Sequence, residues 1–351
     1  MKKFSLALAF VLVLASFSGC MDRNSNSENS DSPKENAQAQ ITDESNSLLP
    51  LADKKNDKAK EENPEEKGEA PREDMPNDAG EKDREYNFPD KTIGFSLDES
   101  KYSSLDKALK GWGPGGPVDE NNRSAGAISY QKLYGKYNAD FILPMGNEII
   151  LTFDEGYENG YTAPILDTLK EKGVRAVFFI TYPYAKDNPE LVRRMIDEGH
   201  IVGNHSTNHT HFPNDPIKSV YEDVLNLHNY VKDNFGYTMH LFRFPFGEFS
   251  ESTLSLMNDL GYKSVFWSFA YKDWERDKQP DPAETLANLE KKSHGGAIYL
   301  LHAVSKTNSD ILGDFIDSMR GKGYNFADYY ELMARELEDA ENQEKTFPEE
   351  N

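Results

Sequence analysis

From residue 148 onward, short apolar runs alternate with longer stretches in which apolar residues recur at a helical period. Apolar runs of strand length occur at residues 149–153, 174–180, 200–202, 240–244, 264–268, 297–301 and 324–326. Helical patterns occur at residues 164–170, 189–198, 217–234, 252–260, 282–292, 310–322 and 329–337. Such alternation predicts an α/β fold with a parallel sheet covered by helices. The seven strand-length runs predict a distorted seven-stranded (β/α) barrel, and a doubly wound open sheet is the alternative.

The first twenty residues have the pattern of an export signal. Residues 1–3 are positively charged at the start, residues 4–17 are apolar, and small residues precede Cys20. The apolar run is too short to span a bilayer. Cys20 is the only cysteine, so no disulfide can form within one chain. The residues before Cys20 resemble a bacterial lipobox, which implies a lipoprotein signal peptide at residues 1–20 and a protein lipid-anchored to the outer face of the cell membrane. Ordinary signal cleavage with release is the alternative.

Composition divides the rest of the chain. Residues 21–89 contain 19 Asp and Glu against 10 Lys and Arg and few large apolar residues, which predicts a disordered acidic tether. Residues 90–145 are predicted to be an N-terminal extension packed on the β/α domain at 146–337, and residues 338–351 an acidic tail. The net charge is −22 and no basic stripe occurs, which excludes nucleic acid as the expected partner.

Two acids, Asp154 and Glu155, come where the first apolar strand of the β/α domain ends. In repeating β/α folds, loops at the carboxyl ends of strands carry the reactive groups because the strands hold them rigidly. The stretch therefore predicts one part of an active site. The alternative is a strand-ending turn whose acids are solvated.

A histidine pair, His205 and His209, follows the third predicted strand, and His211 is close by. At a spacing of four residues, the pair is predicted to lie on one face of a helical turn and to share one divalent ion. Imidazole ligands favour Zn²⁺ over Mg²⁺ or Ca²⁺. A purely structural histidine pair is the alternative.

Other candidate groups also follow predicted strands. Arg243 ends a strand and precedes a proline turn, so it can orient a carboxylate while the turn exposes backbone N–H groups. Asp273 and Trp274 follow the next strand, and His302 ends the strand after that. For His302, a core histidine with one satisfied nitrogen is the alternative.

Taken in order from Asp154 to His302, these stretches resemble the polysaccharide deacetylase family, also called the NodB-homology or carbohydrate esterase family four domain. The residues from Thr152 to Thr162 are similar to the delta-lactam-biosynthetic de-N-acetylase branch. The resemblance implies a NodB-homology barrel and makes residues 146–337 a polysaccharide deacetylase domain. It also implies a hydrolase that acts on linear amide C–N bonds.

The resemblance implies a role for each catalytic group. Asp154 matches the general base and His302 the general acid, while Arg243 matches the residue that orients the base and Asp273 the residue that tunes the acid. The substrate-binding residues would be Tyr157, Phe244, Pro245, Phe246 and Trp274.

The resemblance also implies a divalent metal, Zn²⁺ first, with Co²⁺ or Mn²⁺ as alternatives. His205 and His209 match the two histidine ligands. Glu155 occupies the position of the third ligand, where most family members have Asp and the delta-lactam branch has Asn. We therefore expect Glu155 to bind the metal directly or through water.

The expected activity is metal-dependent removal of acetyl groups from peptidoglycan amino sugars by a monomer that binds glycan strands. The branch implies peptide-free N-acetylmuramic acid as substrate, with muramic delta-lactam formed in spore cortex. Phe246 stands where relatives carry a second arginine that reads the lactyl carboxylate, so N-acetylglucosamine is an alternative substrate. A catalytically impaired wall-binding module is the other alternative, because Glu155 replaces the usual ligand. A phosphatase is disfavoured, since no basic phosphate cradle occurs.

Overall fold

The computed structural model describes residues 86–346. The strands are β1 Lys110–Gly111, β2 Ala139–Asp140, β3 Glu148–Glu155, β4 Val177–Ile180, β5 Ile201–Asn204, β6 Leu241–Phe242, β7 Glu248–Phe249, β8 Lys263–Val265, β9 Phe269–Ala270, β10 Ala297–His302 and β11 Asn325–Phe326. The α-helices are α1 Glu99–Ser103, α2 Ala125–Tyr134, α3 Thr162–Lys172, α4 Tyr182–Asp187, α5 Pro189–Asp197, α6 Ile217–Phe235, α7 Glu251–Asp259, α8 Pro282–Lys291, α9 Lys306–Gly321 and α10 Tyr329–Thr346. The 3-10 helices are η1 Gly135–Tyr137, η2 Phe212–Asn214 and η3 Pro245–Gly247.

Several sequence predictions concern residues outside this range. The export signal at 1–20, the lipidation of Cys20, the tether up to residue 85 and the tail from residue 347 lie outside the described residues. Within residues 86–346, no helix combines the length and apolar content needed to cross a membrane.

A parallel sheet forms the centre of the described unit. Its strand order is β2-β8-β6-β5-β4-β3-β10-β9, and β11 also pairs with β3. Strand β10, late in the chain, pairs in parallel with β3 from Ala297 to His302. Late strands therefore lie beside early ones, as in a curled barrel and not in a doubly wound sheet. The prediction of a (β/α) barrel is therefore confirmed. The sheet has nine strands rather than seven, because β2 and β9, of two residues each, are too short to show a period in the sequence.

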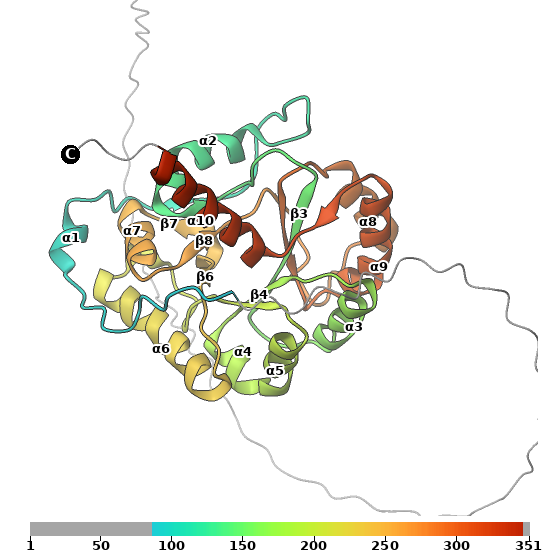
Figure 1. Cartoon of the computed structure of the whole chain (residues 1–351). Helices are drawn as coiled ribbons and strands as arrows, with labels where there is room; N and C mark the ends of the chain where they lie inside the picture. The colour runs from blue at the N-terminus through green and yellow to red at the C-terminus, as the bar shows by residue number, and fades with distance from the viewer. Residues whose placement is uncertain (1–85, 347–351) are drawn as a thin grey trace, which may run out of the picture. The chain divides into compact units, whose positions relative to one another are not determined.

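Alternate residues of each strand face two different layers. On the inner face, Ile150, Phe179, Leu241 and Ile298 form one apolar cluster with Tyr329 at the start of α10. The outer face belongs to a larger cluster shared with the surrounding helices. In Figure 1, α3 to α9 lie around the strands and α10 crosses in front of them. This two-residue alternation decides which side chains can reach the barrel interior.

Local sequence signals explain where several helices begin and end. Ser250 forms a capping box with Thr253 at the start of α7. Thr181 caps α4, and its side chain accepts a hydrogen bond from the Tyr184 N–H. At the other end, Gly236 adopts a left-handed conformation directly after α6, a conformation that glycine adopts without steric cost. These signals set the directions in which the loops leave the sheet.

The segment before β3 packs against the barrel. The Trp112 Nε1–H donates a hydrogen bond to the Trp267 carbonyl at 3.0 Å, and the rings of Phe141 and Phe266 stack with centroids 4.1 Å apart. Strand β2 lies before residue 145 and pairs with β8 in the central sheet. Part of the predicted extension at 90–145 is therefore a strand of the barrel itself.

Candidate active site

A cavity of about 730 Å³ opens at the carboxyl ends of the parallel strands. Its acidic and histidine lining residues come from the ends of separate strands, namely Asp154 near the end of β3, His205 and His209 after β5, and His302 at the end of β10. The lining also contains Gly156, Tyr157, Thr181, Pro183, Thr207, Asn208, Phe244, Phe246, Gly247, Trp267, Trp274, Leu300 and Val304.

Asp154 is held by Arg243. The Arg243 Nη1 donates to Asp154 Oδ1 at 2.8 Å, and both side chains are buried in the barrel interior. Burial raises the pKa of the Asp154 carboxyl. The charge and hydrogen bond of Arg243, together with the charges of His205 and His302, outweigh burial, so the pKa lies below its ordinary value. Asp154 is therefore ionised at neutral pH and has one oxygen, Oδ2, on the side of the histidine pair.

Arg243 is fixed on several sides. Its Nε donates to the Val265 carbonyl at 2.9 Å, and its Nη1 also donates to Thr152 Oγ1 at 2.7 Å. Its guanidinium carbon lies 4.2 Å from the centroid of the Phe179 ring. Because the Arg243 side chain is fully buried and has these partners, its guanidinium is held in one orientation toward Asp154.

On β10, the strand next to that of Asp154, His302 is paired with Asp273. The His302 Nδ1 donates to Asp273 Oδ1 at 2.7 Å, and the His302 backbone N–H donates to Asp273 Oδ2 at 2.8 Å. Burial lowers the pKa of His302, but the charge of Asp273 and this hydrogen bond raise it by more, so the net pKa is raised. His302 and Asp154 are register partners on neighbouring strands, so an imidazole with a raised pKa lies beside an ionised carboxylate at one cavity.

The histidine pair is brought together by a loop. Residues 205–211 form no helix, so the prediction of a helical turn is wrong. Ser206 and His209 adopt positive φ angles of 75° and 50°, and these reverse the chain so that the rings of His205 and His209 have centroids 4.9 Å apart. His211 does not join the pair, because its Nδ1 donates to Glu248 Oε2 at 2.5 Å near the surface.

Both paired imidazoles are neutral near pH 7. Burial lowers the pKa of His205 and lowers that of His209 to about 4. The His205 Nδ1 donates to the Arg243 carbonyl at 2.9 Å, so the hydrogen is on Nδ1 and the lone pair on Nε2. That Nε2 lies 3.5 Å from Asp154 Oδ2. One carbonyl thus orients the ring and selects the tautomer, as is common for metal-binding histidines.

Glu155 does not join this group. Consecutive residues of a strand point to opposite faces, so Glu155 shares the helix-covered face with Phe153, while Asp154 points into the barrel. Glu155 is fully buried, does not line the cavity, and neither carboxylate oxygen has a hydrogen-bond partner. Burial raises its pKa well above the ordinary value. The structure therefore does not place Glu155 where the sequence analysis expected a metal ligand.

Aromatic side chains surround the cavity mouth. Tyr157, Phe246 and Trp274 are 43%, 51% and 49% exposed, whereas Phe244 is buried in the wall. Phe246 adopts φ 59° and lies between the rings of His209 and His211, with centroids 4.5 and 4.4 Å away. Pro245, also predicted to bind substrate, is buried in the turn and does not line the cavity.

The sequence analysis missed several supporting side chains. Asn308 of α9 donates to Asp273 Oδ2 at 2.6 Å and to the His302 carbonyl at 3.1 Å. Asp223 of α6 accepts hydrogen bonds from the backbone N–H groups of Thr207 and Asn208 in the histidine loop. For Asp223, which lies within the helical pattern at 217–234, a polar residue on the inward face of a helix was the available signal. Asn308 lies before the pattern at 310–322, so the predicted elements gave no signal for it.

The arrangement suits acid–base chemistry on a bond held in the cavity. It combines an ionised carboxylate, a histidine whose pKa is raised and two neutral imidazoles on a (β/α) barrel. This set is typical of hydrolases that add water to a carbonyl group.

Comparisons with known proteins identify the family. A family model described as polysaccharide deacetylase matches residues 144–265. The chain is 39% identical over 227 residues to the peptidoglycan-N-acetylmuramic acid deacetylase PdaA of Bacillus subtilis, a match that covers 63% of this chain and 85% of that protein. The chain belongs to the polysaccharide deacetylase family and is a hydrolase of amide C–N bonds.

Further comparisons agree with this assignment. The solved structure of Bacillus subtilis PdaA, a family 4 carbohydrate esterase, is 36% identical and matches with a TM-score of 0.62, covering 66% of this chain and 99% of that one. The peptidoglycan-N-acetylglucosamine deacetylase PgdA of Listeria monocytogenes is 32% identical over 191 residues, which cover 54% of this chain and 40% of that protein.

Proposed function

We propose that this protein removes the acetyl group from N-acetylmuramic acid residues of peptide-free peptidoglycan in a reaction that depends on a divalent metal ion. The observation that carries the proposal is the pairing of Asp154 and His302 at one cavity with pKa values shifted in opposite directions. The similarity to the muramic acid deacetylase PdaA supports the substrate. Because muramic acid carries a lactyl carboxylate, the freed amine can close onto it as the delta-lactam of spore cortex.

His205 and His209 fit a divalent metal in part. Both imidazoles are neutral, and the lone pair of His205 Nε2 is on the side of Asp154. Within residues 86–346, no group of three or more His, Cys, Asp or Glu side chains has the arrangement of a metal site, and Glu155 does not supply the missing ligand. We propose Zn²⁺ as the ion, with Co²⁺ or Mn²⁺ as alternatives. When bound, it supplies a Lewis acid that polarises the acetyl carbonyl and makes nearby water more acidic.

Asp154 acts as the general base in this proposal. As a water oxygen bonds to the acetyl carbon, Asp154 takes the proton through Oδ2, the oxygen that Arg243 does not bind. Arg243 keeps Asp154 ionised and oriented. The carboxylate is therefore already deprotonated when the water proton is transferred to it.

His302 acts as the general acid. Asp273 binds its Nδ1, which leaves Nε2 as the nitrogen available to the cavity. The imidazolium donates the Nε2 proton to the amide nitrogen as the C–N bond breaks, because an amide anion is too basic to leave unprotonated. The products are acetate and the amino sugar.

The exposed rings of Tyr157, Phe246 and Trp274 would bind the sugar, since their flat apolar faces lie at the cavity mouth. We propose that Cys20 carries a lipid anchor and that the acidic segment lets the enzyme reach wall glycan at the outer face of the membrane. This part rests on the sequence alone.

N-acetylglucosamine is a second candidate substrate. The observation that favours it is the absence of Lys and Arg from the cavity lining within the described part of the chain, because a lactyl carboxylate calls for a cation. The similarity to the glucosamine deacetylase PgdA also supports it.

The test is acetate release from peptide-stripped peptidoglycan by the full-length protein, first treated with chelator and then supplied with Zn²⁺, Co²⁺ or Mn²⁺. We expect metal-dependent release, loss of release in Asp154→Asn, and muramic acid as the deacetylated sugar by mass spectrometry. Acetate release from N-acetylglucosamine residues alone would overturn N-acetylmuramic acid as the substrate. Glycan binding with no release under any metal would instead support a wall-binding module.

A further inference from the structure

The proposed substrate contains a charge that the cavity lining does not match. N-acetylmuramic acid differs from N-acetylglucosamine by a lactyl ether that ends in a carboxylate. The inference below rests on the proposed function, because it asks how that carboxylate is recognised. Arg243 is unsuited to the task, since its side chain is fully buried and already binds Asp154.

A second arginine, Arg276, lies beside Tyr157, a residue of the cavity lining. Its guanidinium carbon is 5.7 Å from the centroid of the Tyr157 ring, and Tyr157 lines the cavity. Arg276 is exposed and comes two residues after Trp274, another lining residue. A guanidinium over an aromatic face is held by a cation–π attraction while its N–H groups remain available to a ligand.

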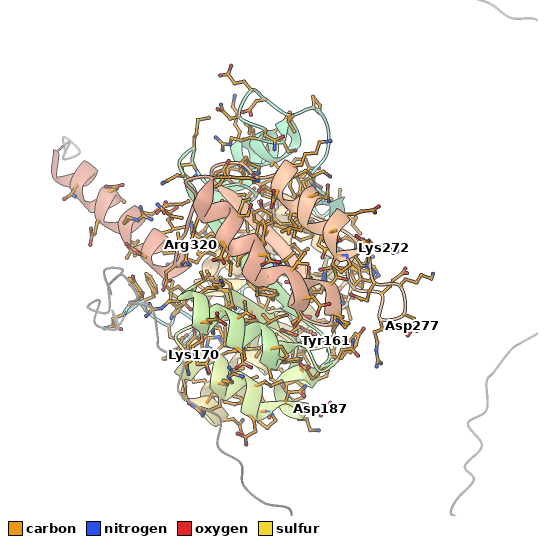
Figure 2. The ribbon with its side chains drawn as sticks, turned by 90° about the vertical axis from the view of Figure 1, so that its right-hand side faces the viewer. Tyr161, Lys170, Asp187, Lys272, Asp277 and Arg320 are labelled. Carbon is orange, nitrogen blue, oxygen red and sulfur yellow. The ribbon has the colours of Figure 1, made fainter. Side chains whose placement is uncertain are left out.

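Among the described residues, the charge of Arg276 has no acidic partner. The neighbouring cations Lys272 and Lys278 both pair with Glu275, at 2.5 and 3.5 Å. Among residues 86–346, Arg276 has no ion pair or hydrogen bond with another side chain. Figure 2 shows Lys272 and Asp277, which flank this stretch, on the right of the molecule, whereas α10 extends to the left. The stretch therefore lies at the end of the barrel opposite α10.

We propose that Arg276 binds the lactyl carboxylate of muramic acid and thereby selects it over glucosamine. A planar guanidinium can donate two parallel hydrogen bonds to a carboxylate, which gives both affinity and orientation. Tyr157 places the guanidinium beside the proposed sugar site, where a cation would attract the carboxylate of an anionic glycan. Arg276 is a specificity residue and takes no part in bond breaking.

The test compares Arg276→Gln with Lys278→Gln, a matched control that removes a cation from the same stretch. Each variant is assayed on peptide-stripped glycan and on the same glycan whose lactyl carboxylates have been converted to methylamides. Acetate release from muramic acid is assigned by mass spectrometry. We expect Arg276→Gln to raise KM about tenfold on the carboxylate glycan, with kcat unchanged and no effect on the methylamide. Arg276→Lys should recover part of the loss, and Lys278→Gln should behave as wild type.

Two results would overturn the inference, and they differ. If wild type prefers the carboxylate glycan and Arg276→Gln keeps that preference in full, muramic acid is still the substrate but Arg276 does not read it. If wild type releases no acetate from muramic acid in either glycan, the proposed function itself fails, and this is seen without any variant.

Discussion

The Nη1 of Arg243 donates one hydrogen bond to Asp154 Oδ1, at 2.8 Å, inside a barrel where the Arg243 side chain is fully buried and the Asp154 side chain reaches only the cavity. Arg243 follows β6 and Asp154 lies on β3, so the contact joins strands that are not neighbours in the sheet. The pair therefore links the ionisation of Asp154, the proposed base, to the folding of the whole barrel.

Replacing Arg243 with Gln should affect both stability and pH dependence. Loss of one partner of a buried ion pair costs about 3–5 kcal/mol of unfolding free energy. Without the positive charge, burial raises the pKa of Asp154, so the acid limb of kcat/KM should move to higher pH. Denaturant unfolding and a pH–rate profile measure both effects. Arg320→Gln, at an exposed site on α9, is the control, and equal behaviour of the two variants would refute the argument.

The pairing of Asp273 with His302 should set the alkaline limb of the pH dependence of kcat/KM. In Asp273→Asn, burial still lowers the pKa of His302 and the largest opposing charge is gone, so the imidazolium loses its proton at lower pH. We expect the alkaline limb of kcat/KM to move to lower pH and the maximal rate to fall about 10²–10⁴-fold. The control is Asp277→Asn, which removes an exposed acid four residues away. An unmoved alkaline limb in Asp273→Asn would assign that limb to another group.

Glu155 should be dispensable for metal binding. Because its side chain lies on the outer face of β3, Glu155→Gln should leave the Zn²⁺ affinity measured by calorimetry unchanged, whereas His209→Ala should weaken it at least tenfold. A marked loss of affinity in Glu155→Gln would show that the carboxylate turns inward to the ion.

Glu155 should also contribute to the pH dependence of folding. Its pKa is raised in the folded protein, so its contribution to stability is complete below the ordinary value of 4.5 and is lost as pH rises toward the folded value. The stability of wild type relative to Glu155→Gln should therefore fall as pH rises above about 4.5. Unfolding free energies of the two proteins at several pH values measure this difference, and a constant difference would contradict the raised pKa.

The left-handed backbone conformation of Phe246 should lower the stability of the fold, while its exposed ring should aid substrate binding. Its φ of 59° suits glycine, and a left-handed conformation costs other residues about 1–2 kcal/mol. Both Phe246→Ala and Phe246→Gly should raise KM several-fold because the exposed ring is lost. Phe246→Gly should be the more stable of the two by about 1 kcal/mol, the reverse of the usual order. Thermal unfolding tests this, and a less stable glycine variant would show that the backbone is not strained.

Much of the fold could be predicted because the strand runs have a simple apolar pattern. Each of the seven predicted runs overlaps a strand of the barrel, β3 and β10 among them. The short strands β2 and β9 could not be predicted, since two residues have no period and depend on their neighbours for pairing.

The sequence by itself determined which chemical groups are available and at which strand ends they occur. Asp154, Arg243 and His302 occur at or just after the ends of apolar runs, and parallel strands bring their carboxyl ends to one edge of a sheet. The tertiary structure decided which groups meet. Asp154 points into the barrel and Glu155 points out of it. A loop without a helix brings the rings of His205 and His209 together. Arg276 lies beside Tyr157. These outcomes depend on strand faces, left-handed loop residues and contacts between distant segments, and the order of residues along the chain does not record them.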